Sequence, residues 1–242
     1  MGNGGPFSTH YPDTTPDPYT GSKSIREVYE SVDDEDGKYT VPILYDTKTK
    51  TIVNNESSEI IRMLNSEFNE FATDPDLDLY PSELRKAIDA VNEWVYPNLN
   101  NGVYRCGFAK TQKAYNQAIK ELTEAFDKVN DMLQKQRYIA SDDAVTEADI
   151  RLFVTLVRFD EVYTVYFKTN TRSVAHTPAV LNYCREIYQL PGIKETVNME
   201  HIKTHYYCSH PNLNYYSIIP AGADFEALLA EPHDRDELFP KK

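Results

Sequence analysis

The sequence of 242 residues predicts a chain in two parts, a small α/β unit followed by a larger all-helical unit. Between Tyr39 and Leu64, short apolar stretches separated by turn residues give way to a helical pattern. From Tyr80 onward, apolar residues recur every three or four positions over several long segments, as they do in helices that bury one face. The acidic, proline-containing stretch 74–79 separates the two patterns and marks the expected boundary.

The first part begins with residues 1–22, which are rich in Gly, Pro, Thr and Asp and are expected to be extended. Residues 24–32 predict a short helix. An apolar strand at 39–45 and a second strand at 51–53 follow, joined by a polar turn, and a helix is expected over 56–64. A strand-turn-strand-helix unit is too small to bury its own faces, so residues 23–74 are expected to form an incomplete α/β domain.

The second part, residues 80–210, is expected to be all-helical. The predicted helices cover 82–96, 112–137, a buried helix from about 147 to 157, 180–188 and 193–207. Ser82 is expected to cap the first of these, and Thr146-Glu-Ala-Asp149 is a variant of the capping box. Residues 211–242 form a proline-rich tail whose charged end, from Glu231, is expected to be loose.

Composition excludes several functions. The chain carries 38 Asp and Glu against 25 Lys and Arg, and such an acidic chain repels phosphate backbones, so no nucleic-acid partner is expected. No apolar run is long enough to span a bilayer and the N-terminus lacks a signal-peptide core, so no membrane partner and a cytoplasmic location are expected. Three widely spaced cysteines do not form a disulfide framework.

Several long motifs stand in the order found in one known family. They are Ile52–Arg62, Asn100–Gln112, Thr146–Phe153, Leu156–Asp160 and His201–Tyr207. In these motifs the chain resembles the glutathionyl-hydroquinone reductases, also called Xi-class or omega-like glutathione transferases, over most of residues 20–210. The resemblance implies a glutathione-transferase fold of class α+β/α, in which a thioredoxin-like N-terminal domain, incomplete here, precedes an all-α C-terminal domain. It also implies a homodimer formed through the helical domain.

The resemblance implies that Val41, Pro42, Glu56 and Ser57 bind glutathione. The proline would be cis, and the backbone of Val41 would pair with the extended tripeptide. Glu56 would pair with the γ-glutamyl ammonium, and Ser57, at a helix N-terminus, would hold the γ-glutamyl carboxylate. The structural alternatives are an ordinary strand with a leading proline and a plain helix cap, which Asn55 could also supply.

The resemblance further implies that Tyr104 and Tyr206 are the catalytic tyrosines. They would line the acceptor site and hydrogen-bond the phenolic oxygen of a glutathionylated quinol. Tyr207 is an equally placed alternative to Tyr206. The structural alternative is that these are ordinary half-buried members of a set of 18 tyrosines.

The reactive cysteine of the family stands in a Cys-Pro-Trp motif, and Cys106, Cys184 and Cys208 all lack that setting. The expected activity is a glutathione-dependent thiol oxidoreductase or transferase that reduces glutathionyl-hydroquinones, with glutathione as co-substrate, impaired in this form unless Cys106 serves as the nucleophile. The alternative is a non-catalytic module that binds glutathione or an aromatic ligand, or that dimerises.

One cluster imitates a metal site. His201 and His205 share a helix face, with Cys208 and His210 nearby, but the family resemblance accounts for this stretch, and no metal is expected.

Overall fold

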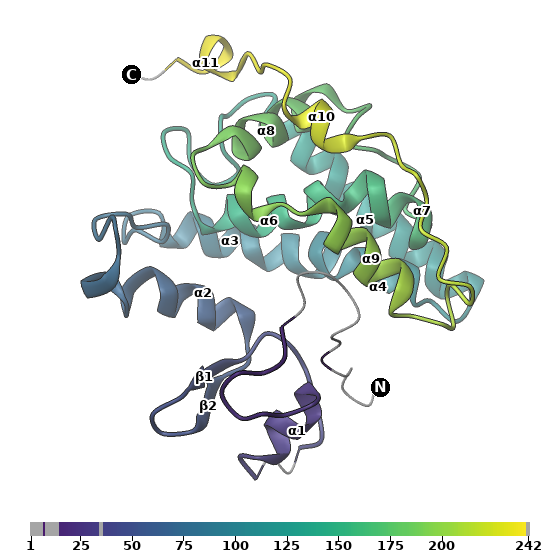
Figure 1. The fold of residues 1–242 in the computed structure, drawn as a ribbon. Coiled ribbons are helices and arrows are strands. Elements are labelled where there is room, and N and C mark those ends of the chain that lie inside the picture. Colours follow the sequence, from purple (N-terminus) through teal and green to yellow (C-terminus); the bar gives the residue numbers. More distant parts are fainter. Residues whose placement is uncertain (1–6, 8–14, 34–35, 241–242) are drawn as a thin grey trace. The chain divides into compact units, whose positions relative to one another are not determined.

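The computed structural model describes residues 7, 15–33 and 36–240, and the chain divides into two compact units, Met1–Asp78 and Leu79–Lys242 (Figure 1). Most of the segment expected to be extended, residues 1–22, lies outside the described residues. Residues 15–22 form neither helix nor strand. No helix in the described part of the chain has the length and hydropathy that a bilayer crossing requires.

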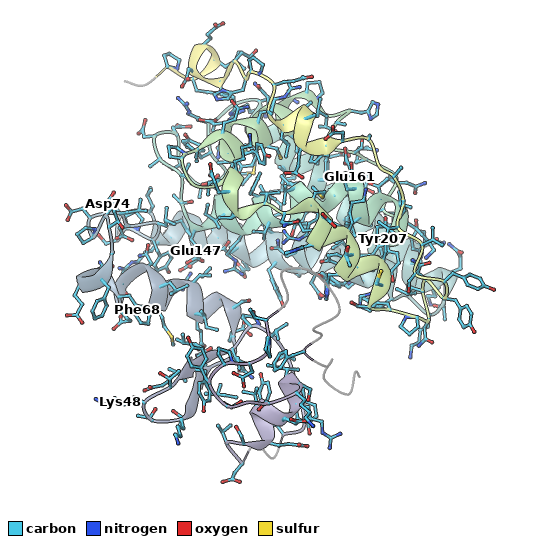
Figure 2. All side chains as sticks on the ribbon, viewed as in Figure 1. Lys48, Phe68, Asp74, Glu147, Glu161 and Tyr207 are labelled. Atoms are coloured by element: carbon cyan, nitrogen blue, oxygen red, sulfur yellow. The ribbon has the colours of Figure 1, made fainter. Side chains whose placement is uncertain are left out.

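The first unit combines a β-hairpin with two α-helices. Its elements are α1 (Ile25–Glu30), β1 (Leu44–Asp46), β2 (Thr51–Asn54), α2 (Ser57–Ser66) and the 3-10 turn η1 (Asn69–Phe71). The two strands are antiparallel, and the hairpin turn is held by the carboxylate of Asp46, which accepts from the amide of Lys48 at 2.8 Å. Lys48 is labelled on this hairpin in Figure 2. The first strand is shorter than predicted, since only Leu44–Asp46 pairs, and Pro42 has no amide hydrogen to donate to a ladder.

The second unit is helical throughout its regular structure. Its elements are α3 (Arg85–Val95), the π-helical turn η2 (Tyr96–Asn100), α4 (Gly102–Gly107), α5 (Gln112–Leu133), α6 (Glu147–Arg158), the π-helical turn η3 (Phe159–Tyr163), α7 (Thr164–Tyr166), α8 (Pro178–Gln189), the 3-10 turn η4 (Lys194–Thr196), α9 (Met199–Cys208), α10 (Phe225–Leu229) and α11 (Arg235–Leu238). Among these elements, α4, α7, α10, α11 and the two π turns are not predicted by the sequence.

Several helix boundaries differ from prediction, and the helix predicted over 112–137 ends at Leu133. Ser82 does not cap α3, which begins three residues later at Arg85. The helix expected over 193–207 is interrupted, because Asn198 adopts an extended backbone and its side-chain oxygen accepts from the amide of His201 at 2.9 Å. An asparagine side chain that bonds a nearby amide in this way starts a new helix rather than continuing the old one.

The predicted capping box is present and lies in the core. Asp149 is fully buried, and its carboxylate accepts from the amide of Thr146 at 2.9 Å, from the Thr146 hydroxyl at 3.0 Å, from the amide of Ile139 at 2.9 Å and from the Tyr183 hydroxyl at 2.9 Å. Burial raises the pKa of Asp149 above its usual value, while these four donors oppose the rise. The carboxylate thereby fixes the start of α6 against the loop that follows α5 and against α8.

The C-terminal segment up to residue 240 is not loose, which corrects the sequence-based expectation for residues 231–240. Figure 1 shows α10 and α11 running along α8. Arg235 is 1% exposed, and it donates to Glu186 at 2.8 Å and to the carbonyl of Leu133 at 3.3 Å. Arg137 donates to the same glutamate at 2.7 Å. A buried carboxylate on α8 thus pairs with arginines from two directions, a contact that local sequence does not reveal.

Arg235→Met should lower the free energy of unfolding by about 3 kcal/mol, since it leaves Glu186 buried with one arginine instead of two. Urea unfolding would measure this. Arg172→Met is the matched control, because the Arg172–Asp127 pair is 40–48% exposed and should contribute less than about 1 kcal/mol. Equal losses in the two variants would contradict a structural role for the buried contact.

Candidate functional site

The first unit brings the predicted glutathione-binding stretches together through a residue that the sequence analysis placed only on a helix face. The Tyr29 hydroxyl donates to the carbonyl of Thr40 at 2.9 Å and lies 3.1 Å from the side-chain nitrogen of Asn55, which donates to it. Tyr29 is 2% exposed. It therefore links the residue before Val41 to the residue before Glu56.

The Val41–Pro42 peptide bond is cis, as the resemblance implies. The Val41 side chain is 74% exposed. Within the part of the chain that the structure describes, no group hydrogen-bonds the amide or carbonyl of Val41. The backbone at Val41 is thus available to an extended peptide.

Glu56 is the N-cap of α2, and Asn55 is not. The Glu56 carboxylate accepts from the amide of Ser58 at 3.3 Å and from the Ser58 hydroxyl at 3.0 Å. Ser57, the first residue of the helix, is exposed, and its amide and hydroxyl have no acceptor among the described residues. The amide hydrogen of Ser57, which has no acceptor among the described residues, and the positive end of the helix dipole form a position that favours an anion. Capping and ligand binding are compatible at this helix start.

The second unit brings Tyr104 and Tyr206 into direct contact. Their hydroxyl oxygens are 2.5 Å apart, although the residues are 102 positions apart in the sequence. A third phenol extends this line of hydroxyl groups, because the Tyr163 hydroxyl lies 2.8 Å from that of Tyr206. The three come from α4, α9 and η3. Tyr163 is 3% exposed, Tyr206 6% and Tyr104 37%, so the series runs from the core towards solvent.

Aromatic rings surround these hydroxyls. Phe167 is fully buried, with ring centroids 5.3 Å from Tyr104, 5.6 Å from Tyr163 and 5.9 Å from Tyr206. Phe108, which is 44% exposed, follows the last residue of α4, and its ring is nearly parallel to the ring of Tyr104. Gly107 permits this packing, because a Cβ there would lie 2.1 Å from the Phe167 ring. The site is an apolar, aromatic surface with a single line of hydroxyl groups.

Burial and contact among the hydroxyls keep these phenols protonated. Desolvation raises the pKa of Tyr206, and its hydrogen bond with Tyr104 raises it further. Desolvation and the two neighbouring phenols raise the pKa of Tyr163 well above its usual value. At neutral pH both are therefore hydrogen-bond donors rather than bases.

The structure distinguishes Tyr206 from Tyr207. The Tyr207 hydroxyl donates to the carbonyl of Glu161 at 3.0 Å, and its ring packs against Tyr166 at 4.8 Å (Tyr207 and Glu161 are labelled in Figure 2). Tyr206 alone of the two joins Tyr104. Sequence reasoning missed Tyr163, although it stands three residues after the Leu156–Asp160 motif; its role depends on a π turn that periodicity does not predict.

Two of the three cysteines, Cys106 and Cys184, are buried. Cys106 is 2% exposed, and burial raises the pKa of its thiol to about 11. Burial also raises the pKa of Cys184 well above its usual value. Cys208 is half-buried, with its sulfur 3.8 Å from the carbonyl of Ser217. Reactive cysteines need an accessible thiol with a lowered pKa, whereas Cys106 lies in the hydrophobic core and its pKa is raised.

One member of the histidine cluster, His210, packs against the aromatic site. His210 lies 3.2 Å, through Nδ1, from the carbonyl of Tyr206, and its ring packs edge-on against Phe108 at 5.4 Å. Within residues 15–33 and 36–240, no group of three or more histidine, cysteine, aspartate or glutamate side chains is arranged to hold a metal ion.

Comparison with known proteins places this geometry in a family. Residues 112–186 match the model for the glutathione S-transferase C-terminal domain. The chain is 41% identical, over 98% of its length and 71% of the relative's, to glutathionyl-hydroquinone reductase YqjG of Escherichia coli K12. It is 44% identical to glutathionyl-hydroquinone reductase PcpF of Sphingobium chlorophenolicum, over 87% of this chain and 67% of the relative.

The chain belongs to the family of the glutathionyl-hydroquinone reductases and Xi-class glutathione transferases. Solved structures agree. The glutathione-bound structure of YqjG matches with a TM-score of 0.90 over 97% of this chain and 75% of that one, at 41% identity. Glutathione transferase Xi 1 of Trametes versicolor matches with a TM-score of 0.85 at 47% identity, over 89% of this chain and 75% of that one. The family's glutathione-transferase fold, a thioredoxin-like domain followed by a helical one, is therefore the fold of this chain.

The raised phenol pKa values predict a loss of stability at alkaline pH. Above about pH 10 the unfolded chain ionises these tyrosines while the folded chain keeps them protonated, so the unfolded state binds fewer protons and stability falls as pH rises. Urea unfolding at about pH 9 and about pH 11 would measure this fall. Tyr206→Phe should reduce it, and Tyr215→Phe, at a 79% exposed position, should not. An unchanged pH dependence in Tyr206→Phe would contradict the prediction.

Proposed function

We propose that this protein is a glutathione-dependent thiol oxidoreductase that reduces glutathionyl-hydroquinones. The observation that carries the proposal is the line of three hydroxyls from Tyr163 through Tyr206 to Tyr104, set in an aromatic surface in a member of this family. A phenolic substrate oxygen needs an apolar surface for its ring and a hydrogen-bond donor for its oxygen, and the second unit supplies both.

Glutathione is the proposed co-substrate, held by the first unit. The backbone of Val41 pairs with the tripeptide beside Pro42. The amide and hydroxyl of Ser57 hold the γ-glutamyl carboxylate, and Glu56 pairs with the ammonium of the same residue. Three observations support these roles. The backbone at Val41 is free, the start of α2 is exposed, and the Tyr29 hydroxyl hydrogen-bonds both Thr40 and Asn55.

The reaction follows from the chemistry of the thioether. A cysteine thiolate attacks the glutathionyl sulfur, the bond between sulfur and the aromatic carbon breaks, and that carbon takes up a proton. The enzyme is left as a mixed disulfide, which a second glutathione thiolate resolves by releasing oxidised glutathione. Tyr104 donates to the quinol oxygen, and Tyr206 stabilises the charge that develops by donating to Tyr104 in turn.

The thiolate is the group that the printed sequence does not provide in the family's Cys-Pro-Trp setting. Because Cys106 and Cys184 are buried with raised pKa values, we propose that this chain by itself is catalytically impaired. The alternative, a non-catalytic module that binds glutathione or an aromatic ligand, shares all the binding residues and differs only in the thiol. We also propose a cytoplasmic homodimer that uses the helical unit, as the resemblance implies.

The first test of this function measures thiol transfer from a glutathionyl-hydroquinone to glutathione. The chain of residues 1–242 should be inactive, and a chain extended at its N-terminus by a strand carrying Cys-Pro-Trp should be active. In the extended chain Tyr104→Phe should lower kcat by about 100-fold, the effect of removing a donor from a developing oxyanion. Cys106→Ser should retain activity. If the printed chain is active and Cys106→Ser abolishes that activity, the assignment of the nucleophile is wrong.

The second test measures glutathione binding to the printed chain by calorimetry. Glu56→Gln should weaken binding about tenfold, because it removes one charge-assisted contact while leaving an oxygen that can cap α2. Glu59→Gln is the matched control, since that carboxylate is in the same helical turn but accepts from Asn54. Equal affinities for the two variants would contradict the role of Glu56.

A further inference from the structure

Tyr206 reaches its two partners only if α9 lies in one register against the π turn η3. The contacts that fix this register are separate from the tyrosine hydroxyls. They centre on Glu161, which stands in η3 two residues before Tyr163 and is labelled in Figure 2. Its side chain is 3% exposed.

Glu161 joins three segments of the second unit. Its Oε2 accepts from Nζ of Lys203 on α9 at 3.1 Å. Its Oε1 accepts from the amides of Ala223 and Phe225, at 3.0 and 3.2 Å, where the chain returns into α10. Its backbone carbonyl accepts from the hydroxyl of Tyr207 at 3.0 Å. The carboxylate is therefore satisfied by one ammonium and two amides, as a buried charge requires.

The geometry of α9 relates this contact to the tyrosine line. Lys203, Tyr206 and Tyr207 stand at positions i, i+3 and i+4, so they share one helix face. Lys203 contacts Glu161 and Tyr206 contacts Tyr163, one helical turn apart on α9 and two residues apart in η3. A slide or rotation of α9 that breaks the first contact also changes the second.

The π turn η3 is also held by the segment that precedes α8. Asp160, next to Glu161, accepts from the amides of Val174 and Ala175 at 2.7 and 2.8 Å. The return segment is fitted closely as well, because Gly222 has a positive φ of 77° and a Cβ there would lie 1.8 Å from Oε2 of Glu161. The η3 turn is thus a fixed support, and the Lys203 ammonium also ties α9 to the return segment through the carbonyl of Ala221 at 2.8 Å.

We propose that Glu161 and Lys203 are a positioning pair, which holds α9 in the register that lets Tyr206 contact Tyr163 and Tyr104 together. The inference rests on the proposed function, since it assigns the pair to the same phenol-binding site. Neither residue needs to touch the substrate. Their effect on the ligand passes through the hydroxyl of Tyr206.

A double-mutant cycle on the full printed chain tests this pair. The probe is 2-(glutathion-S-yl)-hydroquinone, with affinity measured by calorimetry for Lys203→Met, Tyr206→Phe and the double variant. Each single variant should weaken binding about three- to tenfold, the effect of one lost hydrogen bond. The double variant should bind about as tightly as Tyr206→Phe alone, because the register matters only while the Tyr206 hydroxyl is present. Lys203→Arg, which keeps the charge, should restore most of the affinity.

The controls separate positioning from general stability. Arg185→Met removes another partly buried ion pair of the second unit, with Glu231, and should leave affinity for the probe unchanged. Free glutathione should bind Lys203→Met as it binds the unsubstituted chain. If Lys203→Met does not fold, Glu161→Gln replaces it, because the amide oxygen still accepts from Ala223 and Phe225 while the charge is lost.

The outcomes are distinct. Multiplicative losses in the double variant, or unchanged affinity in Lys203→Met, would overturn the positioning role while leaving the site in place. Unchanged affinity in Tyr206→Phe alone would overturn the proposed role of Tyr206, and the inference would fall with it.

Discussion

The buried carboxylate of Asp149 is the contact on which the second unit depends. It receives two hydrogen bonds from Thr146, one from the amide of Ile139 and one from the hydroxyl of Tyr183. A buried charge without partners would be too costly to keep, so the four donors are needed to hold this carboxylate in the core. Because Asp149 holds the first turn of α6, which continues directly into η3, this contact also helps to fix the position of Tyr163.

Part of the site stands where the helices lose their regularity, whereas Tyr104 and Tyr206 lie within the regular helices α4 and α9. The step from α6 into the π turn η3 places Glu161 and Tyr163, two residues apart, against α9. The exit of α4 at Gly107 lets Phe167 approach the helix backbone closely. A π turn adds a residue to a helical turn and so changes which side chains face a neighbour, which explains why such turns often occur at functional sites.

In the proposed function, the residues that bind the two substrates are separate from the thiol that reacts. The first unit offers exposed polar groups at Val41 and at the start of α2, suited to an extended, charged peptide. The second offers a nearly apolar surface with protonated phenols, suited to an aromatic ring with an oxygen. Neither surface includes Cys106 or Cys184, which belong to the core. Binding and thiol transfer can therefore be measured separately in this protein.

The sequence by itself determined the two-part organisation, most helices, the capping box at Thr146 and, through resemblance, Val41, Pro42, Glu56, Ser57, Tyr104 and Tyr206 as candidates. These features depend on local periodicity and on motifs that are contiguous in the chain. Only the tertiary structure decided that Tyr206 rather than Tyr207 meets Tyr104, that Tyr163 and Glu161 support it, and that Arg235 anchors the C-terminal segment. The physical reason is that each of these contacts joins residues more than 40 positions apart, where packing and the rotation of a π turn, not local preference, select the partner.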